Sequence, residues 1–208
     1  MKGLLRKELY TVWAYYRVFV VVVIAFICIG PCNRGSLFLM YYPMLFVGMI
    51  PMSLLAYDEN SKWLAYSAAL PCTRRQIVSA KYLLLLILVA AVTLLTVIAQ
   101  SAYAALHIDA VRLSPSLLCT ILALGLLAPS LVLPIEFKFG VEKGRLVYYA
   151  VMIAASVLAA VFGNSTESVN QTQILPLPVA AWTLPLAAGV LLGVSWLLSV
   201  HFYETREL

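Results

Sequence analysis

Charged side chains are scarce in this sequence of 208 residues. Only 11% of the residues are Asp, Glu, Lys or Arg, whereas an ordinary soluble domain carries about 25%. Hydrophobic residues make up 63%, and the mean hydropathy is +0.97. Apolar residues run along the whole chain, and no polar half separates off as a second unit. This composition excludes a soluble globular protein, and we expect one membrane-embedded domain over residues 1–208.

Metal-ligand patterns and catalytic motifs are also missing. The cysteines at 28, 32, 72 and 119 form no C-x-x-C pair, and only His107 and His201 could join them at a zinc site. The H-E-x-x-H and G-x-S-x-G patterns that intramembrane proteases use do not occur. We therefore expect neither a metal, nor a cofactor, nor catalysis in this chain. Cys28 and Cys32, four residues apart, could share a helix face or form a disulfide in an oxidising compartment.

The basic residues outnumber the acidic ones, with 14 Lys and Arg against 9 Asp and Glu. A nucleic-acid partner would need these cations gathered on one soluble face, which a chain this apolar cannot offer. We therefore interpret the excess as a signal of membrane topology and expect no nucleic-acid partner.

Six apolar runs approach the length of about 20 residues that a membrane-spanning helix needs. They predict an all-α membrane protein in which every charged cluster lies between or beside the spans. The predicted spans are approximately 16–30, 37–57, 82–106, 117–135, 146–163 and 179–202.

The distribution of Lys and Arg predicts the orientation. Six spans place both termini and the segments 58–81 and 136–145 on one side of the membrane, which holds nearly all the basic residues. The opposite side holds only Arg34 and Arg112. By the positive-inside rule, both termini are expected in the cytoplasm, as in a multi-pass protein of the bacterial cell membrane.

The first 15 residues predict an amphipathic helix over about 2–15. Leu5, Leu9, Val12 and Trp13 share one face, and Glu8 falls on another. The pattern favours an elbow helix lying along the inner leaflet, with an ordinary basic flank as the alternative.

No span carries an Asp, Glu, Lys or Arg near its middle, where proton relays and ion-coupled sites normally have them. Gln100 and Ser101 are the most polar neighbours within a span. They either face a substrate path or bond within the helix bundle.

The segment between the second and third spans carries the most informative pattern. Trp63, Tyr66 and Leu70 are three and four residues apart, so a helix beginning at Asp58 would present them on one face before Pro71 ends it. Acidic residues at its start would suit the helix dipole. Such a helix would fit a partner's groove or cap the bundle at the lipid interface.

The pattern Asp-Glu-x-x-Lys-Trp-x-x-Tyr-x-x-x-Leu-Pro-x-x-Arg-x-x-Ile-Val-x-x-Lys-Tyr, residues 58–82, resembles the first cytoplasmic loop of small bacterial permeases of the ABC-2 class of ABC transporters. The stretch Phe-Lys-Phe-Gly-Val-Glu-Lys-Gly-Arg, residues 137–145, is similar to that family's second cytoplasmic loop. With the elbow helix and six spans, the resemblance covers essentially the full length.

The resemblance implies the permease subunit of an exporter of hydrophobic or amphipathic compounds, of the peptide, bacteriocin or antibiotic class. A separate ATPase subunit would bind ATP and Mg, in keeping with the absence of a G-x-x-x-x-G-K-[S/T] phosphate loop here. A second permease copy or a paralogue would complete the pathway. The residues that would contact the ATPase are Asp58, Glu59, Lys62, Trp63, Tyr66, Leu70, Arg74, Lys138, Lys143 and Arg145.

Glu136 departs from the pattern, because a neutral residue is expected between Ile135 and the second loop. It could pair with Lys138 or Arg145, or touch the partner. A further alternative for the whole chain is a membrane immunity or sensor protein that binds a toxin or partner without transporting it.

Overall fold

The computed structural model describes residues 2–30, 38–61, 63, 66, 73–106, 115–150, 153 and 178–205. Within this part of the chain all regular secondary structure is helical, which confirms the all-α prediction. The helices are α1 Lys2–Tyr15, α2 Arg17–Ile29, α3 Phe38–Asn60, α5 Arg74–Ala105, α6 Pro115–Phe139, a helix over residues 141–150, and α8 Pro178–Thr205.

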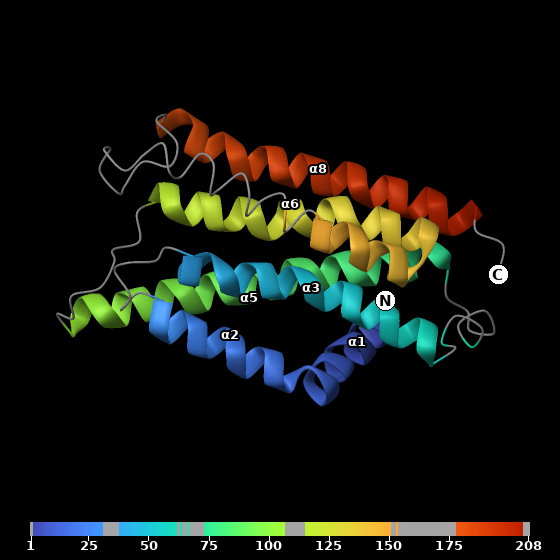
Figure 1. Ribbon diagram of the computed structural model, residues 1–208, viewed down its shortest axis with the longest axis horizontal. Coiled ribbons are helices and arrows are strands. Elements are labelled where there is room, and N and C mark those ends of the chain that lie inside the picture. The colour runs from blue at the N-terminus through green and yellow to red at the C-terminus, as the bar shows by residue number, and fades with distance from the viewer. Residues whose placement is uncertain are drawn as a thin grey trace.

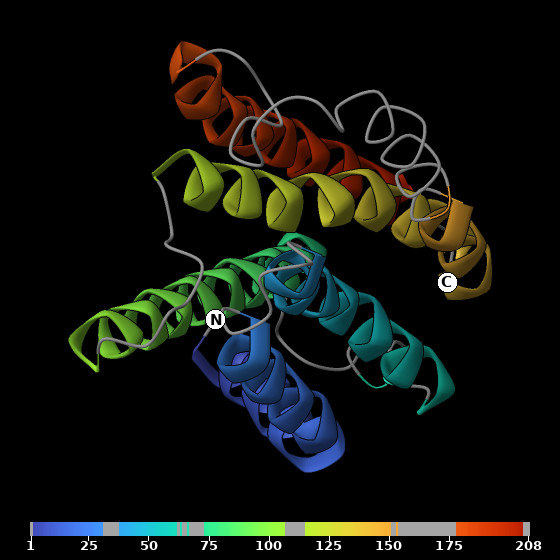
Figure 2. The same cartoon turned by 60° about the vertical axis from the view of Figure 1, so that its left-hand side comes forward.

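The long helices lie lengthwise beside one another (Figure 1). Helices α6 and α8 pack together on one side, α3 and α5 lie in the middle, and α1 and α2 lie on the other side (Figure 2). Helix α3 contacts α2, α5 and α6, and α5 also packs on α8. The core between them is formed by fully buried apolar side chains, among them Val47, Val78, Leu85 and Leu133.

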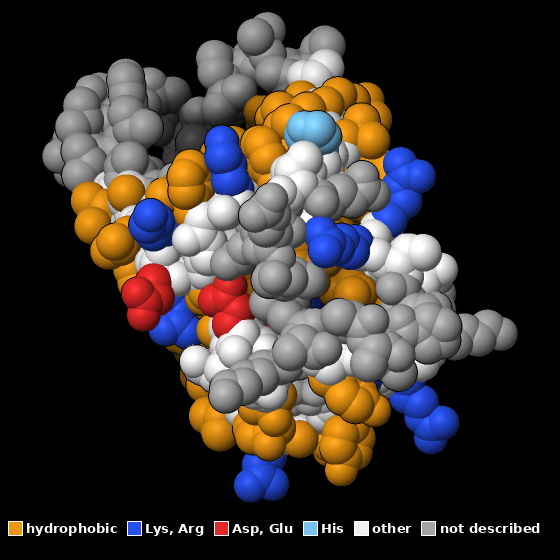
Figure 3. Space-filling model, turned by 90° about the vertical axis from the view of Figure 1, so that its right-hand side faces the viewer, with side chains coloured by type: hydrophobic (Ala, Val, Ile, Leu, Met, Phe, Trp, Pro, Cys, Tyr) orange, Lys and Arg blue, Asp and Glu red, His pale blue; other side chains and the backbone are white. Residues whose placement is uncertain are grey.

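One end of the bundle brings together the C-terminal ends of α3 and α8 and the start of α5. The Arg74 guanidinium donates a hydrogen bond of 3.3 Å to the backbone carbonyl of Tyr203, which joins α5 to α8 there. Lys, Arg, Asp and Glu side chains gather on this end (Figure 3). We call it the polar end and define it by Asn60, Arg74, Phe139 and Thr205.

Three of the described helices are long and apolar enough to cross a membrane: Arg74–Ala105, Leu117–Phe139 and Thr183–Tyr203. The count rises to four if the bent pair Gly3–Tyr15 and Arg17–Ile29 forms one span. Helix α2 alone has 13 residues and a length of about 20 Å, which is short for a hydrocarbon core of about 30 Å. The six predicted spans therefore remain a prediction.

Helix α1 covers the range predicted for the elbow helix, and a bend of 76° separates it from α2. That α1 lies along the inner leaflet stays a prediction. Glu8 faces the bundle with Leu4 and Val12, whereas Leu9 and Trp13 are exposed. The apolar periodicity alone did not reveal that Glu8 has ionic partners inside the bundle.

Helix α5 begins at Arg74, earlier than the predicted span 82–106. Thr73 and Gln76 form a capping box, in which the Thr73 side chain accepts from the Gln76 backbone N–H and the Gln76 side chain accepts from that of Thr73. This cap satisfies backbone donors at the start of the helix. It places Lys81, predicted to lie in a loop, inside α5.

The fifth predicted span, 146–163, is described only at its start, by the helix over 141–150 and by residue 153. Cys32 and His107 lie outside the described residues, so the pairing of Cys28 with Cys32 stays a prediction.

Candidate functional site at the polar end

Asp58 and Glu59 belong to the last turn of α3, which ends at Asn60. The prediction that a separate helix begins at Asp58 is therefore wrong. That prediction assumed that carboxylates are placed favourably at a helix N-terminus. In the structure, Asp58 is instead stabilised by direct ion pairing. Trp63 and Tyr66 are helical, but Lys62 and Leu70 lie outside the described residues.

A buried charged cluster joins α1, α3 and α5. Lys81 Nζ of α5 lies 2.9 Å from Glu8 Oε2 of α1 and 2.5 Å from Asp58 Oδ2 of α3. Lys7 pairs with the other Asp58 oxygen and lies 3.2 Å from Glu8 Oε1. The relative exposures of Glu8, Asp58 and Lys81 are 3%, 2% and 1%. We call Lys7, Glu8, Asp58 and Lys81 the charged cluster.

The charged cluster is balanced, because two cations face two carboxylates. Isolated charges in such a place would carry a large desolvation cost, which pairing and hydrogen bonding offset. Removing one partner from a buried pair typically costs about 3–5 kcal/mol because the other charge is left uncompensated. The cluster therefore holds the middle of α1, the end of α3 and the first turns of α5 in one arrangement.

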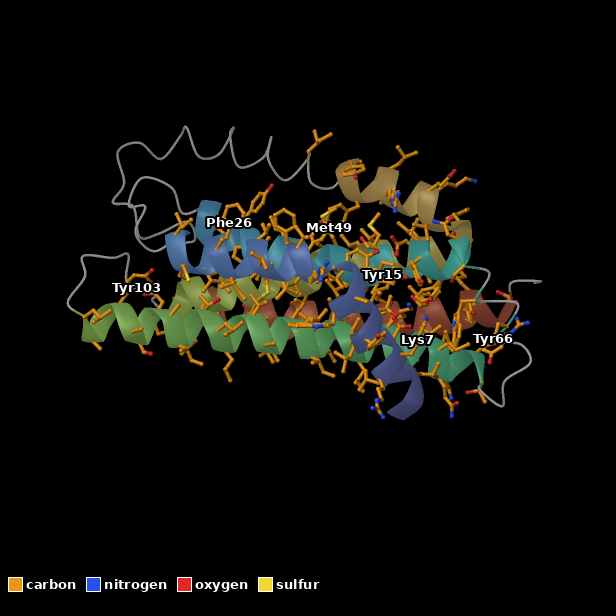
Figure 4. All side chains as sticks on the ribbon, turned by 90° about the horizontal axis from the view of Figure 1, so that it is seen from below. Lys7, Tyr15, Phe26, Met49, Tyr66 and Tyr103 are labelled. Atoms are coloured by element: carbon orange, nitrogen blue, oxygen red, sulfur yellow. The ribbon has the colours of Figure 1, made fainter. Side chains whose placement is uncertain are left out.

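Trp63 and Tyr66 occupy different positions just beyond the charged cluster. Lys7 Nζ lies 4.3 Å from the centroid of the Trp63 ring, in a cation–π contact, and Trp63 packs half-buried against the core. The Tyr66 ring, 5.4 Å from Trp63 between centroids, is 61% exposed. Figure 4 shows Tyr66 at the polar end, with Lys7 nearer the middle of the bundle. The Trp63 ring is thus anchored to the bundle, whereas the Tyr66 ring is accessible.

The second predicted loop, 136–145, is mostly helical. Helix α6 continues to Phe139, Gly140 takes a left-handed conformation with φ 88°, and the next helix runs over 141–150. Gly140 is suited to this turn because a side chain disfavours positive φ. The Val141 backbone N–H donates to Glu59 Oε2 at 3.4 Å, which joins this helix to α3.

The basic residues predicted in the second loop lie at the surface. Lys138 Nζ is 5.1 Å from the Phe139 ring centroid and 4.8 Å from that of Phe202, and Lys143 Nζ is 5.6 Å from Phe139. Arg145 is exposed. Glu136 has a different environment, since it is fully buried, and neither of its carboxyl oxygens forms a hydrogen bond with any described residue. Neither Lys138 nor Arg145 is thus hydrogen-bonded to it.

Of the predicted contact residues, the structure brings Asp58, Glu59, Trp63, Tyr66 and Arg74 together at the polar end. Asp58 is buried and forms ion pairs with two lysines. Glu59 is hydrogen-bonded to Val141, and Arg74 is hydrogen-bonded to Tyr203. The aromatic ring of Tyr66 is the part of this group that is most exposed to a partner.

Gln100 and Ser101, predicted near a substrate path, lie toward the other end of α5. The Ser101 hydroxyl donates to the Ile98 carbonyl of its own helix at 2.7 Å, so it has a local partner. The Gln100 side-chain N–H₂ group is buried without a hydrogen bond to any described residue. Neither residue contributes to the polar end.

Sequence reasoning overlooked Lys7, Glu8 and Lys81 as a cluster with Asp58. A signal was available, because Glu8 shares a face of α1 with Leu4, Thr11 and Val12, at spacings of three and four residues. An acidic residue on a buried face requires a cation from elsewhere in the chain.

The comparison with family models gives a match over residues 3–204 to the family described as "ABC-2 family transporter protein". The chain belongs to the ABC-2 transporter family. Membership makes it a membrane-embedded helical component of a transporter, a kind of component that is generally not itself catalytic and that works with an ABC ATPase. A search of curated proteins and a search of solved structures found no match.

Proposed function

We propose that this ABC-2 protein is the permease subunit of an exporter and that a separate ATPase subunit docks on its polar end. The observation that carries the proposal is the exposed Tyr66 ring next to the anchored Trp63. Exposed aromatic side chains are common anchors in protein interfaces. ATP and Mg would bind to the ATPase, and Lys138, Lys143 and Arg145 would widen the contact surface.

The charged cluster supports a role in transmitting motion. Trp63 contacts Lys7, and Lys7 and Lys81 bind the carboxylates of α1 and α3. Because separating these charges is costly, a displacement of Trp63 and Tyr66 by the ATPase would move α1, the end of α3 and the start of α5 together. Such coupled movement would bias the bundle between inward-facing and outward-facing states.

The polar end would face the cytoplasm, with both termini inside the bacterial cell and six helices spanning the membrane. This orientation rests on the distribution of Lys and Arg. A second copy of this chain or a paralogue would complete the path. The exported compound would be hydrophobic or amphipathic, since no Asp, Glu, Lys or Arg lies near the middle of a predicted span.

The test is purification of the tagged chain from its native membrane in mild detergent, with identification of bound proteins and an ATPase assay on the eluate. We expect a stoichiometric subunit with Walker motifs and ATP hydrolysis. Recovery of the chain alone, or with a non-ATPase partner, across several detergents would overturn the proposal in favour of an immunity or sensor protein.

A further inference from the structure

Glu136 is a buried carboxyl group outside the charged cluster. It lies on α6, one turn before Gly140, and its relative exposure is 0%. Neither carboxyl oxygen forms a hydrogen bond with any residue that the structure describes. A buried ionised carboxylate without a partner is strongly disfavoured, and such groups normally bind a proton instead.

The neighbouring charges do not supply a partner cation. Lys81 of α5 acts on Glu136 electrostatically but already binds Glu8 and Asp58. Glu59 of α3 has the same sign as Glu136, and Arg145 of the 141–150 helix is exposed. One uncharged phenol, Tyr82 of α5, is close enough to Glu136 to interact with it electrostatically.

The 141–150 helix closes directly over Glu136. A Cβ atom placed on Gly144 would lie 2.2 Å from Glu136 Cγ and 3.0 Å from Oε1, so the side chain lies against bare backbone. Gly140, with φ 88°, lies between the two helices, and its N–H donates to the Glu136 carbonyl at 2.9 Å. A glycine in this conformation is a natural position for a hinge.

We propose that Glu136 is a proton-binding site that controls the closure of the 141–150 helix on α6. With its proton bound, the neutral carboxyl group fits the dry contact with Gly144. When the helix swings away about Gly140, water reaches the carboxyl group, one proton leaves to solvent, and the carboxylate resists burial. Reclosure takes up one proton from solvent. No covalent step is involved.

This site deepens the proposed function, because it would make the position of Lys143 and Arg145, and hence docking of the ATPase, depend on proton binding. Its tests use neither the ATPase nor a substrate. A negative result in these tests would not contradict the proposed function. Purification of the chain without an ATPase would likewise not affect the outcome of these tests.

The first test is difference infrared spectroscopy on the purified chain in phospholipid nanodiscs. We expect a carboxylic acid C=O band near neutral pH that is lost in Glu136→Gln. Glu142→Gln is the matched control, since Glu142 is an exposed carboxylate in the adjacent 141–150 helix, and it should retain the band. A Glu136→Gln spectrum identical to wild type would overturn the proposal.

The second test measures the distance between spin labels on Asn60→Cys and Glu142→Cys, two exposed positions, in a chain whose own cysteines are replaced. We expect the distance to lengthen on moving to alkaline pH in the parent chain and to stay short in Glu136→Gln. An equal pH response in both would overturn the proposal.

Gly144→Ala keeps the proposal testable if Glu136→Gln fails to fold. The added methyl group would collide with the Glu136 stem and hold the helix away, so we expect the longer distance and loss of the acid band near neutral pH. Retention of both the band and the short distance would also count against the proton site.

Discussion

Lys7 lies over the ring of Trp63, while the Tyr66 ring three residues later is left mostly exposed. The two aromatic side chains therefore contribute differently to the molecule. Trp63 contributes to the bundle itself, through a cation–π contact and packing on the core. Tyr66 makes a ring contact with Trp63 and presents its remaining surface to a partner.

Tyr66→Ala is expected to weaken binding of the ATPase by about thirtyfold, which corresponds to the roughly 2 kcal/mol of an interfacial aromatic anchor. The stability of the isolated chain should stay unchanged. Binding of the purified ATPase to the chain in nanodiscs measures the first effect, and thermal unfolding measures the second. Unaltered binding would remove Tyr66 from the contact surface.

Trp63→Ala serves as the contrasting variant. It removes a cation–π contact worth about 0.5–2 kcal/mol together with packing on the core, so the unfolding temperature of the isolated chain should fall. If Trp63→Ala and Tyr66→Ala had the same stability as wild type, the structural distinction between the two rings would be incorrect.

Lys81→Met is expected to lower the free energy of unfolding by about 3–5 kcal/mol, because Glu8 and Asp58 would lose their shared buried cation. Lys143→Met, at an exposed position of the same polar end, is the control and should change little. Reversible unfolding in mixed micelles provides the measurement.

Asp58→Asn added to Lys81→Met tests whether the charges act as a unit. In the double variant Lys7 still pairs with Glu8, and the Asp58 carboxylate that would otherwise lack its buried cation is gone. The double variant should therefore be more stable than Lys81→Met alone. Additive losses would argue against a coupled cluster.

Asp58→Lys should prevent folding, since it would gather three lysines around Glu8. A well-folded Asp58→Lys chain would contradict this expectation.

Much of the helical layout could be predicted from the sequence, because long apolar runs and the amphipathic start are local signals. The burial of Glu8 in α1 and the environment of Asp58 could not. Asp58 binds Lys7 and Lys81, 51 and 23 residues away in the chain, and no local pattern records such pairings. The burial of Glu136 was equally hidden, because it depends on how the helix after Gly140 folds back.

Tyr82→Phe is expected to destabilise the contact between α5 and α8. The Tyr82 hydroxyl is 2.7 Å from the hydroxyls of both Ser195 and Ser199, and all three residues are buried. Each serine would lose a partner, at a cost of about 1–3 kcal/mol. Thermal unfolding measures the effect, and Tyr10→Phe, on an exposed ring, is the control. An equal response in the two variants would show that the hydroxyl cluster adds no stability.

Gly125→Ala is expected to destabilise the contact between α3 and α6 by about 1–3 kcal/mol, the usual cost of overpacking. A Cβ atom on Gly125 would lie 2.3 Å from Cγ of the buried Met44. Gly189→Ala in α8 is the matched control, because nothing lies within 4 Å of its added atom. If Met44→Ala failed to relieve the loss in Gly125→Ala, the cause would lie elsewhere.

The ion pair between Glu8 and Lys81 has a consequence for the biosynthesis of the protein. The two residues are 73 positions apart, so the ribosome releases Glu8 long before Lys81 exists. Helix α1 cannot take its final place against the bundle until the start of α5 has been translated. During that interval Glu8 must stay hydrated, so the N-terminal helix, although it is the first to be made, settles only after the start of α5 has joined it.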